Sequence, residues 1–99
     1  MPKVYVVNRG GHDYSAAERF GTLIYCTEGS LSKYDTGMMY REIVAAMQDS
    51  EPEDYILLTS LPSLCSVASA IFASKHSRVN FLIWQDGDYV DRTLMLNGL

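Results

Sequence analysis

The chain is short of basic residues, of cysteines and of long apolar runs, and each shortage excludes a class of protein. Its 8 Lys and Arg residues stand against 12 Asp and Glu residues, which gives a net charge of −4. Without a dominant basic face, neither a nucleic-acid duplex nor a membrane is expected as a partner. No apolar run approaches the roughly 18 residues of a transmembrane helix, and the opening Met-Pro-Lys-Val does not read as a signal peptide.

Cysteine is equally scarce. The chain has 2 cysteines, Cys26 and Cys65, without the spacing of a metal site. Both fall within predicted secondary structure, so we interpret them as free thiols of a cytoplasmic protein. The sequence also lacks the G-x-G-x-x-G, P-loop and G-x-S-x-G patterns, and it predicts neither a metal nor a cofactor.

What remains has the composition of one globular domain over residues 1–99, with 47% hydrophobic and 20% charged residues. Apolar runs rich in β-branched and aromatic residues predict five strands, over 3–8, 22–27, 55–60, 79–84 and 89–95. Apolar residues at helical spacing predict two helices, over 38–49 and 62–75.

Shorter polar segments are given local roles. Asp13 is expected to cap a short helix over 14–20, which ends at Gly21 in the left-handed conformation. Asp35 or Thr36 offers the N-cap of the next helix. The acidic connection over 50–54 is interpreted as a solvated turn.

The alternation of strands and helices predicts an α/β fold. Linking helices imply right-handed parallel crossovers, so helices should cover both faces of a mostly parallel, Rossmann-like sheet of about five strands. The strand over 55–60 is the most apolar and is expected near the centre. The pair Asp86-Gly87 predicts a two-residue primed turn, after which the last strand returns antiparallel.

Two loops should share the edge of the sheet where ligands of such folds bind, beyond the carboxyl ends of the strands. Glycines that allow close backbone approach, a cation and an imidazole follow the first strand, at Asn8, Arg9, Gly10, Gly11 and His12. Hydroxyl groups at a helix N-terminus follow the third, at Thr59, Ser60 and Ser63. Both loops suit an anion, and Tyr34 from the long loop between them is expected to close over it as a lid.

Plainer interpretations of both loops remain open. The first is a glycine turn in which Asp13 caps the short helix and His12 is simply exposed. In the second loop, Ser60 merely caps the following helix. Conversely, His12 is a candidate general acid or base, although no partner group is evident for it.

The helix over 62–75 has almost no charge. Apart from Lys75 it presents small residues on its second face, namely Ser66, Ser69, Ala70, Ala73 and Ser77. A surface helix rarely lacks charge in this way, so this face is expected to meet a second copy of the chain or another protein.

Three segments together carry a resemblance to a known group. Residues 4–21, with their Asn-Arg-Gly-Gly-His-Asp sequence, the run over 54–60 and the run over 89–93 resemble small uncharacterised proteins of bacteriophages and mobile elements. The resemblance implies a phage origin and the host cytoplasm as location. It implies no catalytic residue, and it suggests counter-defence against host nucleotide signals only by association.

Three hypotheses follow. The leading one is a binding protein for a phosphate-bearing small molecule such as a nucleotide or a cyclic nucleotide signal. The second is a protein–protein interaction module, either a homodimer or an inhibitor of a host protein, that uses the helix over 63–75. The third is a small phosphodiesterase or hydrolase that depends on His12.

Overall fold

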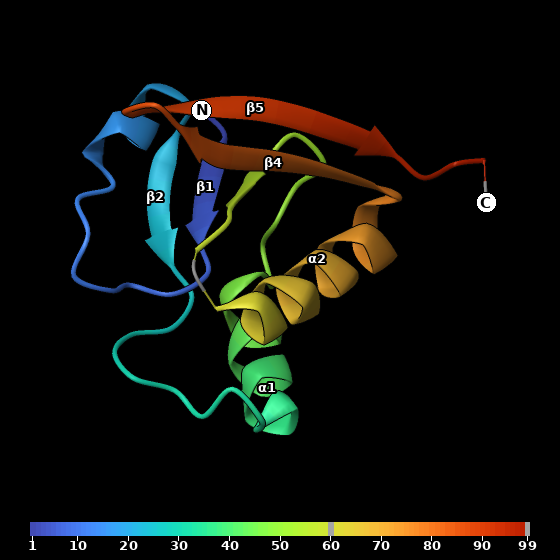
Figure 1. Cartoon of the computed structure of the whole chain (residues 1–99). Coiled ribbons are helices and arrows are strands. Elements are labelled where there is room, and N and C mark those ends of the chain that lie inside the picture. The colour runs from blue at the N-terminus through green and yellow to red at the C-terminus, as the bar shows by residue number, and fades with distance from the viewer. Residues whose placement is uncertain (60, 99) are drawn as a thin grey trace.

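The computed structural model describes residues 1–59 and 61–98 and shows a five-stranded sheet with two α-helices and one 3-10 helix (Figure 1). Along the chain the elements are β1 (Lys3–Val6), η1 (Ser15–Arg19), β2 (Thr22–Tyr25), α1 (Thr36–Ala46), β3 (Tyr55–Leu57), α2 (Pro62–His76), β4 (Arg78–Gln85) and β5 (Asp88–Met95).

The strand order is β2-β1-β3-β4-β5. The first four strands are parallel, and β5 pairs antiparallel with β4. The α/β class, the mostly parallel five-stranded sheet and the central third strand are therefore confirmed. The chain leaves β1 in one direction for β2 and returns in the other for β3, an order found in doubly wound sheets and consistent with a Rossmann-like description.

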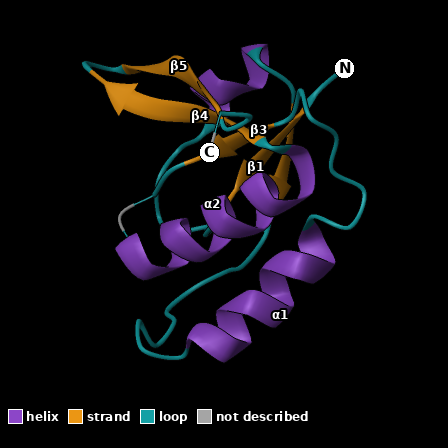
Figure 2. Cartoon of the chain, turned by 90° about the vertical axis from the view of Figure 1, so that its right-hand side faces the viewer, coloured by secondary structure: helices purple, strands orange, loops and turns teal. Residues whose placement is uncertain are grey.

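The two faces of the sheet are covered unequally. Helices α1 and α2 lie side by side on one face (Figure 2), where both pack against a core that includes Tyr5, Ile56 and Val79. On the other face, η1 contributes Ala17 to a smaller core around Val6. Helical cover on both faces is present as predicted, but on the second face it is a single short 3-10 helix.

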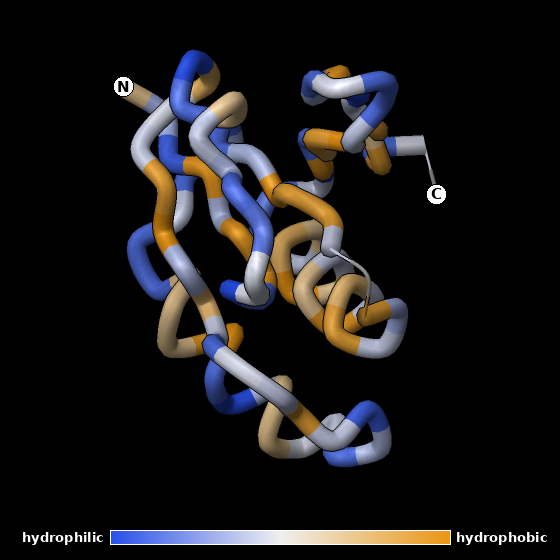
Figure 3. Tube along the Cα trace, turned by 60° about the vertical axis from the view of Figure 1, so that its left-hand side comes forward, coloured by the Kyte–Doolittle hydropathy of each residue, from blue (hydrophilic) through white to orange (hydrophobic). Residues whose placement is uncertain are grey.

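Apolar colouring in Figure 3 follows the strands and the inner sides of the helices, while hydrophilic segments mark the loops. In the part of the chain that the structure describes, no helix combines the length and apolar character needed to cross a bilayer.

Several predicted boundaries are too long. The predicted strands over 3–8 and 22–27 end at Val6 and Tyr25, and the strand over 55–60 leaves the ladder after Leu57. The helix predicted over 38–49 is shifted towards the N-terminus, because the Asp35 carboxylate accepts a hydrogen bond from Met38 N at 3.1 Å and caps it.

Gly21 is not the left-handed stop that the sequence suggested. Positive φ angles occur at Gly29 and Gly87 but not at Gly21. A Cβ atom at Gly21 would instead lie 2.1 Å from the carbonyl oxygen of Pro2. The position requires glycine because two backbone segments approach each other there.

The β4–β5 turn is the primed turn that Asp-Gly predicts. Asp86 and Gly87 have φ angles of 51° and 90°, as a type I′ turn requires at both central residues. The turn sets the register in which Trp84 lies directly opposite Tyr89.

The sequence predicted a solvated turn over 50–54. This prediction is wrong for Asp54, which is only 1% exposed. Its carboxylate accepts hydrogen bonds from Lys3 N at 2.9 Å and from Glu51 N at 2.8 Å, and it lies 3.5 Å from Lys3 Nζ. Asp54 therefore joins the start of β1 to the start of β3.

Candidate small-molecule site at the carboxyl ends of the strands

A cavity of about 540 Å³ lies where the loop after β1, the end of β3 and the β4–β5 hairpin meet. These three segments supply its lining residues, which are His12, Asp13, Tyr14, Leu57, Leu58, Thr59, Trp84 and Tyr89. The two loops that the sequence singled out thus contribute to one cavity, through His12 and Thr59.

One wall of the cavity is aromatic. Trp84 and Tyr89 pair across the hairpin with ring centroids 4.9 Å apart and an edge-to-face angle of 68°. Trp84 is 54% exposed, whereas Tyr89 is 5% exposed. Burial raises the pKa of the Tyr89 phenol, so its hydroxyl stays protonated at neutral pH. The pair therefore supplies two aromatic rings, set nearly at right angles, to the wall of the cavity.

Tyr14 holds the loop that carries His12. Its hydroxyl donates to Asn8 O at 3.2 Å and accepts from Gly10 N at 3.2 Å. Asn8 in turn donates from Nδ2 to Gly29 O at 3.2 Å and accepts at Oδ1 from Thr27 Oγ1 at 2.9 Å. Asn8 and Gly10 therefore shape the loop and are not among the residues that line the cavity.

Arg9 is directed elsewhere. Its guanidinium lies 4.6 Å from the centre of the Tyr25 ring and 4.0 Å from a carboxylate oxygen of Glu28. Its backbone continues the parallel pairing of β1 and β2, since Arg9 N donates to Thr27 O at 2.8 Å. The structure does not bring Arg9 into the cavity that contains His12. Gly11 does not line it either, and no atom lies within 4 Å of a Cβ built there.

The corner between β3 and α2 contains unpaired hydroxyl groups. The side-chain oxygens of Thr59 and Ser63 are buried and have no hydrogen-bond partner among the described residues. The N-cap position of α2 is Leu61, which provides no side-chain cap. Ser60, predicted as a ligand contact or a cap, lies outside the described residues. Buried hydroxyls are normally paired, so this corner is a place where a ligand or water would satisfy them.

Tyr34, predicted as a lid, is 82% exposed in the loop before α1 and does not line the cavity. Its ring lies 5.3 Å from the Lys33 ammonium. The structure therefore places Tyr34 apart from the other predicted residues.

His12 and Asp13 are among the polar residues that line the cavity. The His12 ring contacts Tyr14 edge-on at 6.3 Å, and no hydrogen bond joins it to another side chain in the described ranges. The hydrogen bond from Ser15 N lowers the pKa of Asp13, so this carboxylate is ionised at the cavity mouth. No cluster of three or more metal-ligating side chains occurs among the described residues.

Sequence reasoning overlooked the aromatic wall, although a signal for it existed. Trp84 ends a strand predicted to run parallel to the strand over 55–60, and therefore to end at the same edge of the sheet. The primed turn then sets Tyr89 opposite Trp84. Leu57 and Leu58 were taken only as strand residues, yet both also line the cavity.

A family model described as "Phage Pam3 gp32-like protein" matches residues 2–96, which is nearly the whole chain. The chain belongs to this family. The resemblance to small phage proteins is thereby confirmed, and the match covers every element of the sheet together with the cavity. No curated protein and no solved structure matches the chain.

Proposed function

We propose that this member of the Pam3 gp32-like family binds a small molecule that joins a flat ring to a phosphate group, such as a nucleotide or a cyclic nucleotide signal. The observation that carries the proposal is the single cavity in which His12 and Thr59, 47 positions apart in the sequence, lie beside the aromatic pair Trp84 and Tyr89.

The size and lining of the cavity support a ring-bearing ligand. Small-molecule sites commonly measure about 300–1,000 Å³ and combine apolar walls with a few polar groups, and this cavity measures about 540 Å³. The half-exposed Trp84 ring offers a face for stacking, while Leu57 and Leu58 supply apolar contact.

We assign the phosphate group to the corner between β3 and α2, where Thr59 lines the cavity, although no residue of α2 is among the lining residues. The first N–H groups of this 15-residue helix have no intrahelical acceptor, and the helix dipole favours an anion there. Thr59, which lines the cavity, also carries a buried hydroxyl without a partner among the described residues. Arg9 contributes only if its guanidinium leaves Tyr25, so the corner replaces Arg9 as the principal anion contact in the proposal.

Family membership supplies the biological setting. The match to a phage family supports the proposal, because a phage protein is made in an infected host cell, where nucleotides are present. Sequestration of such a signal, and hence counter-defence, is the role that we infer for the cavity.

Isothermal titration calorimetry tests the proposal with a panel of mononucleotides and cyclic dinucleotides. Adenosine, which lacks phosphate, and ribose 5-phosphate, which lacks the base, serve as matched halves of one ligand. We expect a nucleotide to bind at least about tenfold tighter than either half, which corresponds to about 1.4 kcal/mol of binding free energy. The absence of heat from every member of the panel would refute the proposal.

Thr59→Val sharpens the test. Valine keeps the shape of threonine and removes a hydroxyl that has no partner among the described residues, so stability should be unchanged or slightly raised. Nucleotide affinity should nevertheless fall, and by more than in Arg9→Ala. A larger loss in Arg9→Ala would return the anion site to the loop after β1.

Catalysis by His12 has less support. Turnover of a phosphodiester that is lost in His12→Ala while binding survives would establish it.

A further inference from the structure

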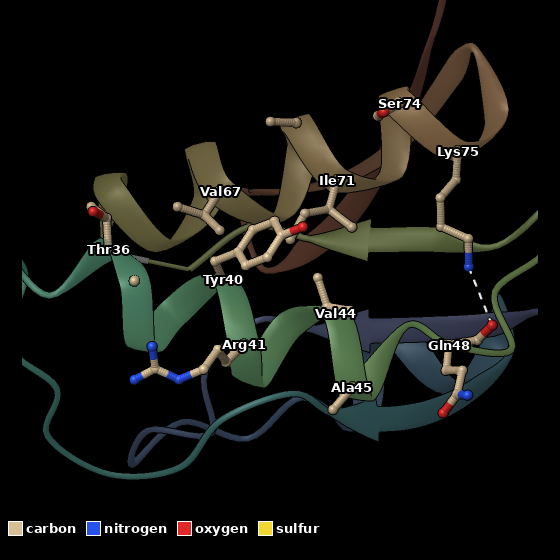
Figure 4. Close-up of a pocket in the computed structure, with 12 residues that line it drawn as sticks. Thr36, Tyr40, Arg41, Val44, Ala45, Gln48, Val67, Ile71, Ser74 and Lys75 are labelled. Atoms are coloured by element: carbon tan, nitrogen blue, oxygen red, sulfur yellow. Dashed lines mark hydrogen bonds between the residues drawn. The ribbon is translucent and has the colours of Figure 1, made fainter.

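A second concave surface lies on the opposite face of the sheet from η1, between α1 and α2. It has a volume of about 1080 Å³ and runs between the two helices (Figure 4). Tyr40 and Val44 on α1 face Val67 and Ile71 on α2 across it. We call this surface the interhelical groove.

The groove exposes apolar side chains that a monomer ordinarily buries. Tyr40 is 57% exposed and Val44 is 41% exposed, one helical turn apart on the same stripe of α1. The buried stripe of α1, which includes Met39 and Ile43, faces the core instead. On α1 the groove thus uses a different stripe from the one that packs on the core, whereas Val67 and Ile71 of α2 also pack against that core.

The charge of the groove is opposite to that of the chain. Arg41 and Lys75 line it and no Asp or Glu does, although the net charge of the chain is −4. Lys75 Nζ donates to Met47 O at 2.7 Å, to Gln48 O at 3.3 Å and to Ser50 Oγ at 2.9 Å, all of them neutral oxygens. Arg41 has no ion pair within the described ranges. Neither cation is neutralised by a carboxylate there.

The two cations lie towards opposite ends of the groove (Figure 4). Lys75 contacts the carbonyl of Gln48, which is two helical turns after Arg41 and about 10 Å along the axis of α1 at a rise of 1.5 Å per residue. An elongated partner with two acidic groups at this separation would meet both charges.

We propose that the interhelical groove docks an amphipathic helix of another protein, with apolar residues towards Tyr40, Val44, Val67 and Ile71 and acidic residues about two turns apart. A helix laid in a groove buries such a stripe along its length. A second copy of the chain is disfavoured. A two-fold contact of groove on groove would place Arg41 and Lys75 of one copy close to the same cations of the other copy, and like charges repel.

A displayed library of 15-residue helical peptides tests the proposal. The peptides carry a fixed apolar stripe and randomised flanking positions, and they are selected for binding to the full chain. We expect enrichment of Asp and Glu at two positions about two turns apart, with depletion of Lys and Arg. Selected peptides without acidic enrichment, or no selected peptide at all, would overturn the proposal.

Variants then locate the bound peptide. Val44→Asp should abolish binding, and Arg41→Glu should weaken it roughly tenfold, as expected for loss and reversal of an ion pair. Arg92→Glu makes the same charge change on β5, outside the groove, and should leave affinity within about twofold. A peptide with Lys in place of the acid that faces residue 41 should recover binding to Arg41→Glu.

Circular dichroism of each variant shows whether it is folded. If Val44→Asp unfolds, the loss of peptide binding in Arg41→Glu and its recovery by the Lys-bearing peptide test the proposal. Indifference of the selected peptides to Arg41→Glu would contradict the charge assignment. A dimer in light scattering that Val44→Asp dissociates would show that a second copy occupies the groove, and would overturn the proposal of a foreign helix.

Discussion

Asp54 illustrates how one side chain joins distant parts of this chain. It is almost fully buried, and its carboxylate satisfies backbone N–H groups of Lys3 and Glu51. Its own carbonyl accepts a hydrogen bond from Asn80 Nδ2 at 2.7 Å, which adds β4 to the connection. The sequence placed Asp54 in an acidic turn but gave no sign of this burial, because Lys3 lies 51 residues away in the chain.

Replacement of Asp54 should be costly. Asp54→Ala leaves two N–H groups without their acceptor, and we expect a loss of about 2–4 kcal/mol in the free energy of unfolding. Glu53→Ala in the same connection removes an exposed carboxylate and should change stability by less than about 0.5 kcal/mol. Urea denaturation of both variants measures the difference, and equal effects would contradict the role given to Asp54.

His76 provides a pH-dependent contact at the end of α2. Its Nε2 lies 2.9 Å from Ser50 Oγ, and Lys75 Nζ donates to the same oxygen at 2.9 Å. Which group donates in the contact between Ser50 and His76 depends on the imidazole tautomer. Burial, followed by the charge of Lys75, lowers the pKa of His76 below its usual 6.5.

The sign of the resulting pH dependence follows from the lowered pKa. The folded state favours neutral His76, so its contribution is present above the unfolded pKa and is lost as pH falls through 6.5 towards the folded value. Between about pH 7 and pH 5.5, the unfolding free energy of the parent chain should fall more than that of His76→Gln. Identical slopes in parent and His76→Gln would contradict this account.

At the scale of elements, β3 shows where a hydrophobic pattern misleads, and α1 shows where a capping residue is a better guide. The apolar run over 55–58 was extended into a strand to residue 60, but the register of β3 with β4 pairs Ile56 and Leu57, and Leu58 adds one backbone hydrogen bond to Leu82 O at 3.2 Å. Leu58 stays apolar because it packs on the core and lines the cavity. Hydrophobicity reports burial, and burial continues after the ladder ends. Capping signals were better guides, as Asp35 and the Asp86-Gly87 turn show.

The approach of Gly21 to Pro2 can be tested directly. Gly21→Ala would place Cβ against the Pro2 carbonyl, so the backbone at Pro2 or at residue 21 must shift. We expect a loss of at least about 2 kcal/mol in the free energy of unfolding. Gly11→Ala meets no atom within 4 Å and should be neutral or slightly stabilising. Thermal unfolding distinguishes them, and a neutral Gly21→Ala would show that the two backbone segments separate without cost.

At the scale of the whole molecule, the α/β class and the mostly parallel sheet were predictable because the strands and helices carry their own periodicities. The strand order β2-β1-β3-β4-β5 was not part of the prediction. Knowledge of the sheet was enough to bring the loops after β1 and β3 to one edge. The directions of side chains were not predictable. Arg9 faces Tyr25 and Glu28 rather than His12, and nothing in the local sequence encodes that choice.

The two faces of the sheet also carry different candidate surfaces. The cavity lies on the side of η1 and the hairpin, whereas the interhelical groove lies on the side of α1 and α2. Because no residue lines both, peptide binding in the groove should leave the environment of Trp84 unchanged. The two proposals can therefore fail independently.

Nucleotide binding in the cavity can be measured directly through Trp84, because the sequence contains a single tryptophan and this residue lines the cavity. A fluorescence titration follows its emission as a nucleotide is added. A base stacked on the indole should quench the emission in a saturable manner, with the same affinity that calorimetry gives, and Thr59→Val should shift the curve to higher ligand concentration. Unchanged Trp84 emission in the presence of calorimetric binding would place the ligand elsewhere and contradict the account.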